Sequence, residues 1–255
     1  MVKEFVRFLD GCLLIGDVLV IGDMHIGYEE SVGKGLLPRV QIKDILEKLG
    51  GVFEVLDGDD VKLKKIVLLG DLKHEFGGIS DSEWRGVLVL LDYLSSKCKE
   101  IILIKGNHDN ILKPIARKRN IKLRNYYKIK MNVEGKGVDG RRVDVCFLHG
   151  HECFKQCLNS DILIMGHLHP SISLKDKYKN EKFKCFLRGK WKRKDVYILP
   201  SFSEISLGYD LRDLDFEKED SFIFIDDRSL RNFEVLIYND KEKKVLGFGG
   251  LGGLV

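Results

Sequence analysis

The 255-residue sequence has no apolar run long enough to cross a membrane, only four prolines and no histidine outside five short blocks. Its longest apolar runs, such as residues 101–104, are strand-sized, whereas a membrane span needs about 20 apolar residues. Residues 1–8 mix charged and apolar side chains and lack the apolar centre of a signal peptide. We therefore expect a soluble cytoplasmic protein with no membrane partner.

Six cysteines are present, and without an export signal we expect them to be reduced and mostly buried. Cys153 and Cys157 are four residues apart, so on a helix they would share one face. No further metal ligands stand near them in the sequence. We therefore interpret this pair as packing residues and not as a metal site.

The seven histidines are confined to five blocks, each with glycine beside the histidine and most with Asp or Asn. Each block follows a run of apolar residues. Imidazole, carboxylate and amide oxygen together form a ligand set for a divalent metal of intermediate softness. The blocks are Gly22-Asp23-Met24-His25, Gly70-Asp71-Leu72-Lys73-His74, Gly106-Asn107-His108-Asp109, His149-Gly150-His151 and Gly166-His167-Leu168-His169.

Short Val- and Ile-rich runs predict strands buried on both faces, at 18–21, 66–69, 101–104, 143–148 and 162–165. Helical spacing of apolar residues predicts helices over 39–49 and 80–94, the second opening with a Ser80–Glu83 capping box. Alternating strands and helices indicate an α/β layered fold. Its reactive groups should lie at the carboxyl ends of the strands, where the histidine blocks stand.

The chain after Pro170 is richer in predicted strands, at 183–188, 196–199, 221–225 and 233–238, with a turn at Arg188-Gly189. We expect these strands to form a second sheet packed against the first. The prediction is one domain over residues 1–246, with a metal-ligand half at about 17–170 and a β-rich half at 171–246. The glycine-rich tail, 247–255, is expected to be partly disordered.

Seven side chains offer metal ligands: Asp23, His25, Asp71, Asn107, His149, His167 and His169. One ion cannot use them all. Two ions about 3.5–4 Å apart, bridged by a carboxylate and a hydroxide, can. Asp71 has two oxygens for this bridge. We expect Mn first, with Zn, Fe, Ni or Co as alternatives.

These five blocks, in this order over residues 17–170, resemble the calcineurin-like metallophosphoesterases. The resemblance implies a four-layer αββα sandwich of two mixed β-sheets flanked by helices, with a dinuclear centre. It places Asp23, His25 and His169 on one metal, and Asn107, His149 and His167 on the other, with Asp71 shared.

The resemblance also implies that His108 faces the leaving-group oxygen. Two ions would make hydroxide available near neutral pH and neutralise phosphate oxygens. His108 is then the candidate general acid for the departing alkoxide. Asp109, next in the chain, is a candidate to orient the His108 ring.

The position of His74, three residues after Asp71, resembles the SbcD-like branch of DNA-repair nucleases, in which this histidine helps to position the phosphodiester. The alternative is a hydrogen-bond donor behind the ligands that never contacts substrate. The role of His151 has the same two alternatives: it either supports His149 from behind or faces the substrate.

A narrower match covers residues 23–31, Leu37-Pro38-Arg39 and 199–202. These segments resemble the archaeal relatives of the ligase-associated DNA-damage-response phosphoesterases. Tyr28, Glu29 and Arg39 then either line the site, with Arg39 binding substrate, or cap and pack the first helix.

Two basic stretches extend the hypothesis to nucleic acid. Residues 113–130 carry eight Lys or Arg and no acid, and 175–194 carry ten, interleaved with aromatic residues such as Phe186 and Trp191. Lysines would bind phosphates and aromatic rings would stack on bases, unless the rings face inward. The leading hypothesis is a nuclease; the alternatives are a hydrolase of small phosphoesters and a non-catalytic scaffold. The oligomeric state, a homodimer included, stays open.

Overall fold

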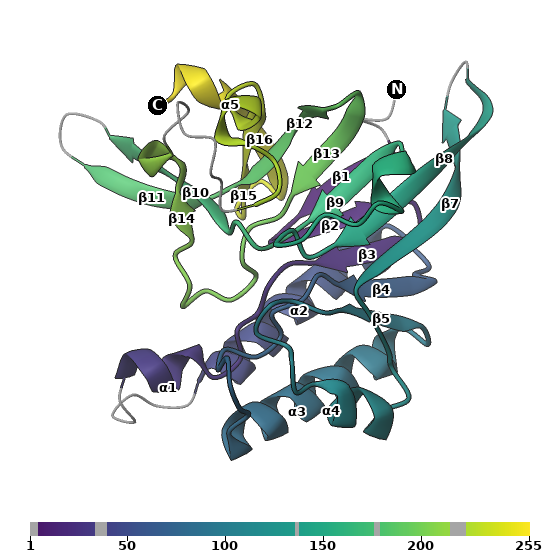
Figure 1. Cartoon of the computed structure of the whole chain (residues 1–255), viewed down its shortest axis with the longest axis vertical. Coiled ribbons are helices and arrows are strands. Elements are labelled where there is room, and N and C mark those ends of the chain that lie inside the picture. Colours follow the sequence, from purple (N-terminus) through teal and green to yellow (C-terminus); the bar gives the residue numbers. More distant parts are fainter. Residues whose placement is uncertain (1–4, 34–39, 136–137, 176–178, 215–222) are drawn as a thin grey trace.

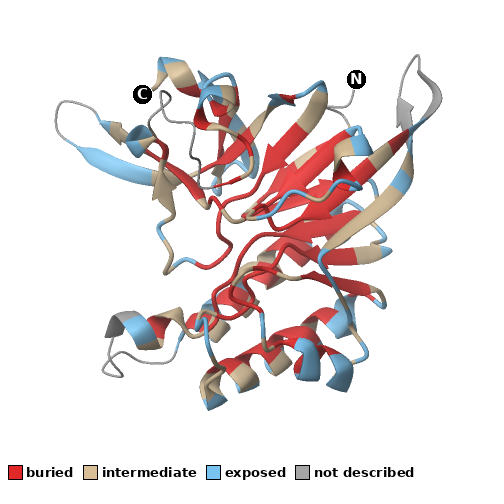
Figure 2. Ribbon diagram, in the orientation of Figure 1, coloured by how far each residue is buried: buried red, intermediate tan, exposed pale blue. Residues whose placement is uncertain are grey.

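The computed structural model of the chain describes residues 5–33, 40–135, 138–175, 179–214 and 223–255. Two large β-sheets pack face to face, and the longer helices cover the outer face of one of them (Figure 1). Buried residues fill both sheets and the loops that run between them (Figure 2). No helix in the described part of the chain combines the length and apolar character needed to span a membrane.

The first sheet has six strands in the order β1-β2-β3-β4-β5-β6. β1 to β3 pair antiparallel, and β3 to β6 pair parallel. In β3, Leu19 and Ile21 face the helices while Val18 and Val20 face the second sheet, which explains the uninterrupted apolar run. The strands are β1 (Val6–Leu9), β2 (Cys12–Ile15), β3 (Val18–Ile21), β4 (Lys65–Leu68), β5 (Ile101–Ile104) and β6 (Lys122–Arg124).

Helices α2 (Gln41–Gly58) and α3 (Asp81–Lys97) form the outer layer on this sheet. The capping box predicted at Ser80 and Glu83 is confirmed at the start of α3. α2 extends well past the predicted end at residue 49. The other helices are short: α1 (Tyr28–Gly33), α4 (Lys113–Lys118) and α5 (Asp227–Leu230).

The second sheet has seven strands in the order β16-β15-β12-β13-β9-β8-β7, parallel over β13-β9-β8 and antiparallel elsewhere. It therefore combines strands from both halves of the chain. The strands are β7 (Tyr126–Gly135), β8 (Val138–Leu148), β9 (Ile162–Met165), β12 (Phe186–Trp191), β13 (Lys194–Ile198), β15 (Glu234–Asn239) and β16 (Lys244–Gly250).

The outer face of the second sheet is covered by short elements where the family resemblance implied helices. A three-stranded sheet in the order β11-β10-β14 lies there, with α5 and three short 3-10 helices. The implied α/β sandwich is thus present, with a thin fourth layer. The small sheet comprises β10 (Pro170–Lys175), β11 (Asn180–Lys184) and β14 (Tyr209–Asp210), and the 3-10 helices are Cys157–Asn159, Leu211–Asp213 and Leu251–Gly253.

The prediction of one strand at 183–188 followed by a turn at Arg188-Gly189 is wrong. The chain leaves the small sheet at Lys184 and enters the seven-stranded sheet at Phe186, so one apolar pattern covers two strands. The turn lies at Lys192-Arg193, both with positive φ, as a tight hairpin turn requires. Gly189 is inside β12, where a Cβ would lie 2.3 Å from the Phe233 ring.

Two further predictions near the C-terminus are wrong. Residues 223–225, expected in a strand at 221–225, form bends, and 221–222 lie outside the described residues. Residues 247–250 of the expected flexible tail belong to β16, which pairs with β15. Leu251 is fully buried after it, because this end of the chain closes the outer core.

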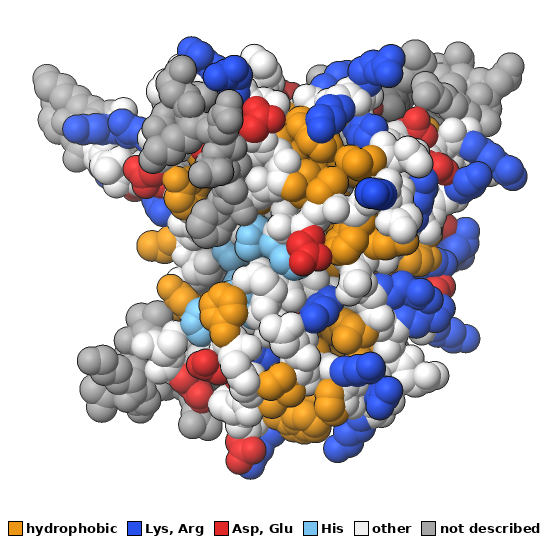
Figure 3. All heavy atoms as spheres, viewed as in Figure 1, with side chains coloured by type: hydrophobic (Ala, Val, Ile, Leu, Met, Phe, Trp, Pro, Cys, Tyr) orange, Lys and Arg blue, Asp and Glu red, His pale blue; other side chains and the backbone are white. Residues whose placement is uncertain are grey.

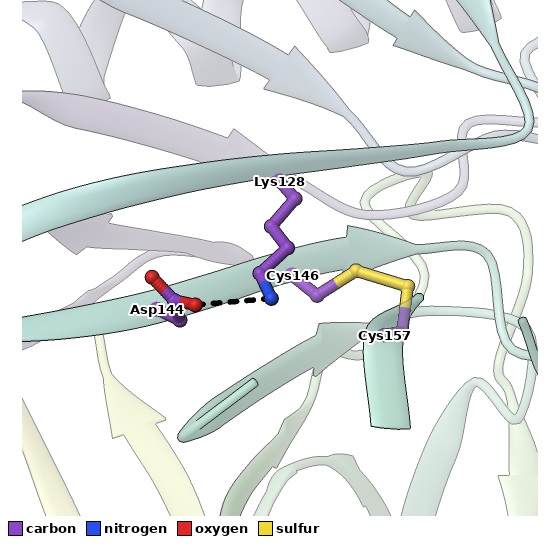
Figure 4. Close-up of a disulfide and its surroundings, with 4 residues drawn as sticks. All are labelled: Lys128, Asp144, Cys146 and Cys157. Atoms are coloured by element: carbon purple, nitrogen blue, oxygen red, sulfur yellow. Dashed lines mark ion pairs between the residues drawn. A yellow bond between two sulfur atoms is a disulfide. The ribbon is translucent and has the colours of Figure 1, made fainter. Parts of the chain in front are cut away.

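The expectation of reduced thiols is wrong for two cysteines. Cys146 on β8 and Cys157 form a disulfide with their Cα atoms 5.5 Å apart (Figure 4). Cys153 is exposed and does not pack beside Cys157. The sequence contains no sign that the loop after His149 folds back against β8.

Candidate metal centre

The histidine blocks meet because they follow parallel neighbouring strands. β3, β4 and β5 end side by side in the first sheet, and β8 and β9 do so in the second. Their loops converge on a cavity of about 430 Å³, and histidines reach the surface in the middle of this face (Figure 3). The cavity is lined by His25, Tyr28, Asp71, His74, Phe76, Asn107, His108, His167, Leu168, His169, Ser206 and Tyr209.

Four of the predicted ligands have a positive φ, a backbone conformation that residues other than glycine rarely adopt. Such a conformation costs about 1–3 kcal/mol per residue and persists where the surrounding structure imposes it. It turns the side chains out of the strand ends and into the cavity. The residues are His25 (φ 46°), Asp71 (φ 46°), His167 (φ 67°) and His169 (φ 48°).

Two of the glycines in the blocks make room for the ligand carboxylates. A Cβ on Gly106 would lie 2.1 Å from Oδ1 of Asp71, and one on Gly166 would lie 2.1 Å from Oδ1 of Asp23. Both distances are far below contact. The glycines at these two blocks are therefore explained by close packing of neighbouring loops.

Asp23, His25 and His169 form a first group of donors. Nε2 of His169 lies 2.6 Å from Oδ2 of Asp23 and 3.3 Å from Nε2 of His25. Oδ2 of Asp71 lies 3.7 Å from the same His25 nitrogen. These atoms surround one point.

Asn107, His149 and His167 form a second group. Nε2 of His149 lies 3.0 Å from Oδ1 of Asn107 and 3.0 Å from Nδ1 of His167. It lies 3.3 Å from Oδ2 of Asp71. The same Asp71 oxygen therefore lies near a donor of each group, as a ligand that bridges through one oxygen requires.

The His149 ring has its tautomer fixed for metal binding. Its Nδ1 is 2.9 Å from the carbonyl oxygen of Leu69, which can only accept a hydrogen bond. Nδ1 therefore carries the proton, and in the neutral ring Nε2 presents its lone pair to the second group. A ligating histidine held by a backbone carbonyl is common in metal sites.

Several pKa values in this centre are shifted because the groups are buried and lie close to one another. Burial, followed by the charge of His169, lowers the pKa of His25 to about 3, and burial with His149 lowers that of His167 to about 4. Burial also opposes a charge on His149, but the carboxylates of Asp23 and Asp71 outweigh it and raise its pKa to about 9. Despite burial, His149 lowers the pKa of both carboxyl groups.

This arrangement fits divalent cations. Each donor group brings two imidazole nitrogens close together, 3.3 Å apart in the first and 3.0 Å apart in the second, and Oδ1 of Asp23 is buried without a hydrogen-bond partner among the described residues. A cation compensates both features. Nitrogen, carboxylate and amide donors together suit a first-row transition metal.

The prediction that Asp109 orients the His108 ring is wrong. Its carboxylate accepts hydrogen bonds from the backbone N–H groups of Leu72 (3.0 Å) and Gly106 (2.9 Å), tying two ligand loops together. Burial, followed by repulsion from Asp71, raises its pKa to about 7. Nδ1 of His108 instead bonds to the carbonyl oxygen of His74, while the His108 backbone N–H donates to Oδ1 of Asp71.

His74 lies in the cavity wall, with its ring against those of Tyr28 and His108. Its Nδ1 is buried and has no hydrogen-bond partner among the described residues, which argues against a purely supporting donor. His151 packs its ring 5.1 Å from that of His149, beside the second group.

The residues of the narrower match have different positions. Tyr28 lines the cavity. Glu29 accepts hydrogen bonds from the N–H groups of Val40 and Gln41, so it caps α2. Arg39 lies outside the described residues. The prediction that Phe186 and Trp191 of the second basic stretch stack on bases is wrong, because these side chains are only 2% and 6% exposed.

Two supporting residues were missed by sequence reasoning. Nε2 of Gln41 donates to the carbonyl oxygens of Met24 and His25, and its Oε1 accepts from Gly27. Oε1 of Glu83 accepts from the N–H groups of His74 and Glu75. The capping box signalled Glu83 as a helix cap only, and nothing in the sequence signalled Gln41.

A family model described as calcineurin-like phosphoesterase matches residues 16–199, and no curated protein matches the sequence. Among solved structures, a nuclease MPE from Pseudomonas putida is 15% identical, with 91% of each chain covered and a TM-score of 0.54, which shows a shared fold.

Two more distant structures are similar over much of the chain. The phosphoesterase Yfce from E. coli is 12% identical, with 80% of this chain and 90% of that chain covered and a TM-score of 0.36. Vacuolar protein sorting 29 from Cryptosporidium parvum is 15% identical, with 91% and 97% covered and a TM-score of 0.39. Because the family model spans most of the sequence, this chain belongs to the calcineurin-like phosphoesterase family and is a metal-dependent phosphoesterase.

Proposed function

We propose that this chain is a dinuclear metal-dependent phosphodiesterase that hydrolyses nucleic acid, with Mn(II) as the first candidate metal. The observation that carries the proposal is the reach of one Asp71 oxygen to His25 in one donor group and to His149 in the other. Asp23, His25 and His169 would hold one ion, and Asn107, His149 and His167 the second. Two such ions lower the pKa of a coordinated water and neutralise the charge on phosphate oxygens.

His108 is proposed to protonate the leaving oxygen. Its ring lines the cavity, and Nδ1 is held by the carbonyl oxygen of His74. That carbonyl accepts only, so Nδ1 must keep a proton and Nε2 is the nitrogen free to give one. His108 therefore acts as an acid in its imidazolium form, and the His74 backbone fixes the direction in which Nε2 points.

His74 and His151 are proposed to contact the substrate. The His74 ring faces the cavity between Tyr28 and His108, in a position to hold a non-bridging phosphate oxygen. The resemblance of its position to the SbcD-like nuclease branch supports a phosphodiester of nucleic acid. Arg39 remains a predicted substrate contact.

A second candidate is a hydrolase of small phosphodiesters. The cavity has the volume of a small-molecule site, and Tyr28, Phe76 and Tyr209 give its rim aromatic surface. These rings would hold the organic group of a cyclic nucleotide as readily as a base at the end of a strand.

Labelled DNA, labelled RNA and bis-p-nitrophenyl phosphate, each supplied with Mn(II), separate these functions. We expect the oligonucleotides to be cleaved, with Asp71→Ala losing metal and activity and His108→Ala keeping metal while losing rate. Cleavage of the small diester without cleavage of any oligonucleotide would favour the second candidate. Metal binding without hydrolysis of any substrate would indicate a scaffold.

A further inference from the structure

A basic groove adjoins the metal centre on the side where β5 and β7 lie. It has a volume of about 720 Å³ and runs from the loop after β5, past the start of α4, to the first residues of β7. Figure 3 shows Lys and Arg side chains gathered on this side of the histidines. Its polar lining consists of Lys105, Asn110, Lys113, Arg124, Asn125 and Lys128, with Tyr126 and Tyr127 beside them.

The charge of this groove is unbalanced. Its lining includes four cationic side chains and no carboxylate. Lys128 is neutralised by Asp144 at 3.0 Å (Figure 4). Lys105, Lys113 and Arg124 form no ion pair with any acid in the described part of the chain. Cationic side chains that only keep a surface soluble are usually interspersed with acidic ones, and these three are not.

The neighbouring depression along the same edge provides an internal comparison. It is lined by Lys64 and Lys65, among others, but Lys64 pairs with Asp17 at 2.6 Å and Lys65 with Glu100 at 2.8 Å. Among the described residues, Lys130 alone of the three cations in this depression has no ion pair, whereas three of the four in the groove have none. Unpaired cations are therefore more numerous in the groove nearer the metal centre.

The loop after β5 lines both the groove and the cavity. Asn107 is a proposed metal ligand in the cavity, and Nδ2 of Asn110 in the groove donates to its carbonyl oxygen.

From this juxtaposition we infer that the groove binds the backbone phosphates of a nucleic-acid strand whose scissile phosphate lies at the metal centre. Lys105, Lys113 and Arg124 contact successive phosphates, while the half-buried rings of Tyr126 and Tyr127 offer surface to the bases. A row of cations ending at a phosphodiester-cleaving site fits a polymer of phosphates and exceeds what a single small diester needs. This inference rests on the proposed function.

The test compares Lys113→Gln/Arg124→Gln with Lys62→Gln/Lys99→Gln. All four side chains are exposed and none forms an ion pair in the described structure. Lys62 and Lys99 precede β4 and β5, at the opposite ends of these strands from the metal centre. Both variants lose two positive charges, so only position distinguishes them. Circular dichroism melting checks that both fold.

The readouts are the KM for a labelled single-stranded oligonucleotide, its dependence on salt, and turnover of bis-p-nitrophenyl phosphate. In the groove variant we expect KM for the oligonucleotide to rise about tenfold at low salt. The slope of log affinity against log salt should fall by about 1.4, because each phosphate contact contributes about 0.7 for a single strand. The control variant and the wild type should have the same KM and slope.

Two outcomes separate the failure of this inference from that of the proposed function. If the wild type cleaves oligonucleotides and the two variants behave alike, the groove assignment is overturned and the nuclease stands. If the wild type cleaves none, oligonucleotide binding is measured by anisotropy in EDTA. Weaker binding by the groove variant alone then supports the groove without the nuclease, and equal binding overturns both.

Discussion

The side-chain amide of Gln41, at the start of α2, donates a hydrogen bond of 2.8 Å to the carbonyl oxygen of His25. The same nitrogen reaches the carbonyl oxygen of Met24 at 3.3 Å and Oγ of Ser203 at 3.0 Å. Gln41 thus fixes the strained turn that directs His25 into the metal centre. A contact that the sequence did not indicate therefore supports the backbone of a proposed metal ligand.

Replacing Gln41 by Leu keeps much of the volume and removes every one of these bonds. The carbonyl oxygen of His25 still accepts from the N–H of Tyr28, but the carbonyl of Met24 and the N–H of Gly27 lose their Gln41 partner. Unsatisfied buried polar groups cost about 1–3 kcal/mol each, so we expect the free energy of unfolding to fall by about 2–6 kcal/mol. We expect metal affinity to fall about 10- to 100-fold, as for other supports of metal ligands. Chemical denaturation and metal titration measure these effects.

Gln156 provides the matched control, because it is the only other glutamine of the chain and is exposed. Gln156→Leu should leave both quantities at wild-type values. Equal metal affinity in the Gln41 and Gln156 variants would show that the turn at His25 keeps its conformation without the hydrogen bonds from Gln41.

Phe76 covers the His108 ring, with centroids 3.5 Å apart, yet 57% of it is exposed at the mouth of the cavity. Base stacking on an aromatic side chain contributes about 1–3 kcal/mol, so Phe76→Ala should raise KM for an oligonucleotide about fivefold or more. Phe248→Ala, on β16, removes another partly exposed ring and serves as the control. Steady-state kinetics in which both variants match the wild type would exclude a stacking role.

Lys184 provides a pH test away from the metal ligands. Burial lowers its pKa to about 8 from the ordinary 10.5, although Glu204 favours its charge, and Nζ donates to the carbonyl oxygens of Ser201 and Ser203. The unfolded chain therefore holds this proton more tightly than the folded chain. The stability contribution of Lys184 is reduced below pH 8 and recovers as pH rises towards 10.5, by at most about 3 kcal/mol.

Unfolding in urea at several pH values measures this effect. We expect the free energy of unfolding of the wild type, minus that of Lys184→Met, to increase between pH 8 and pH 10. Subtracting the variant removes groups that titrate equally in both proteins. A difference that stays constant over this range would mean that Lys184 keeps an ordinary pKa.

The gathering of the predicted ligands at one place could be predicted, because each polar block directly follows an apolar strand in the sequence. A run such as 18–21 must be apolar on both faces, and the block after it must turn, so ligands follow strands directly. Asp23, Asp71 and His149 then meet because their strands end at facing edges of two packed sheets.

The remaining features depend on tertiary placement. Asp109 follows His108 in the chain but turns to backbone N–H groups of two loops. The sequence does not indicate that one strand ends and another begins at Cys185, because both sheets require the same apolar pattern there. Glycine in the C-terminal segment suggested disorder, yet backbone pairing along β16 and the burial of Leu251 order it.

The most direct test of the account is the number of metal ions bound per chain, measured by mass spectrometry of protein reconstituted with Mn(II). We expect two ions in the wild type, one in each of His25→Ala and His149→Ala, and fewer than one in Asp71→Ala, whose carboxylate reaches both donor groups. One ion in the wild type, or two retained in Asp71→Ala, would contradict the shared dinuclear centre.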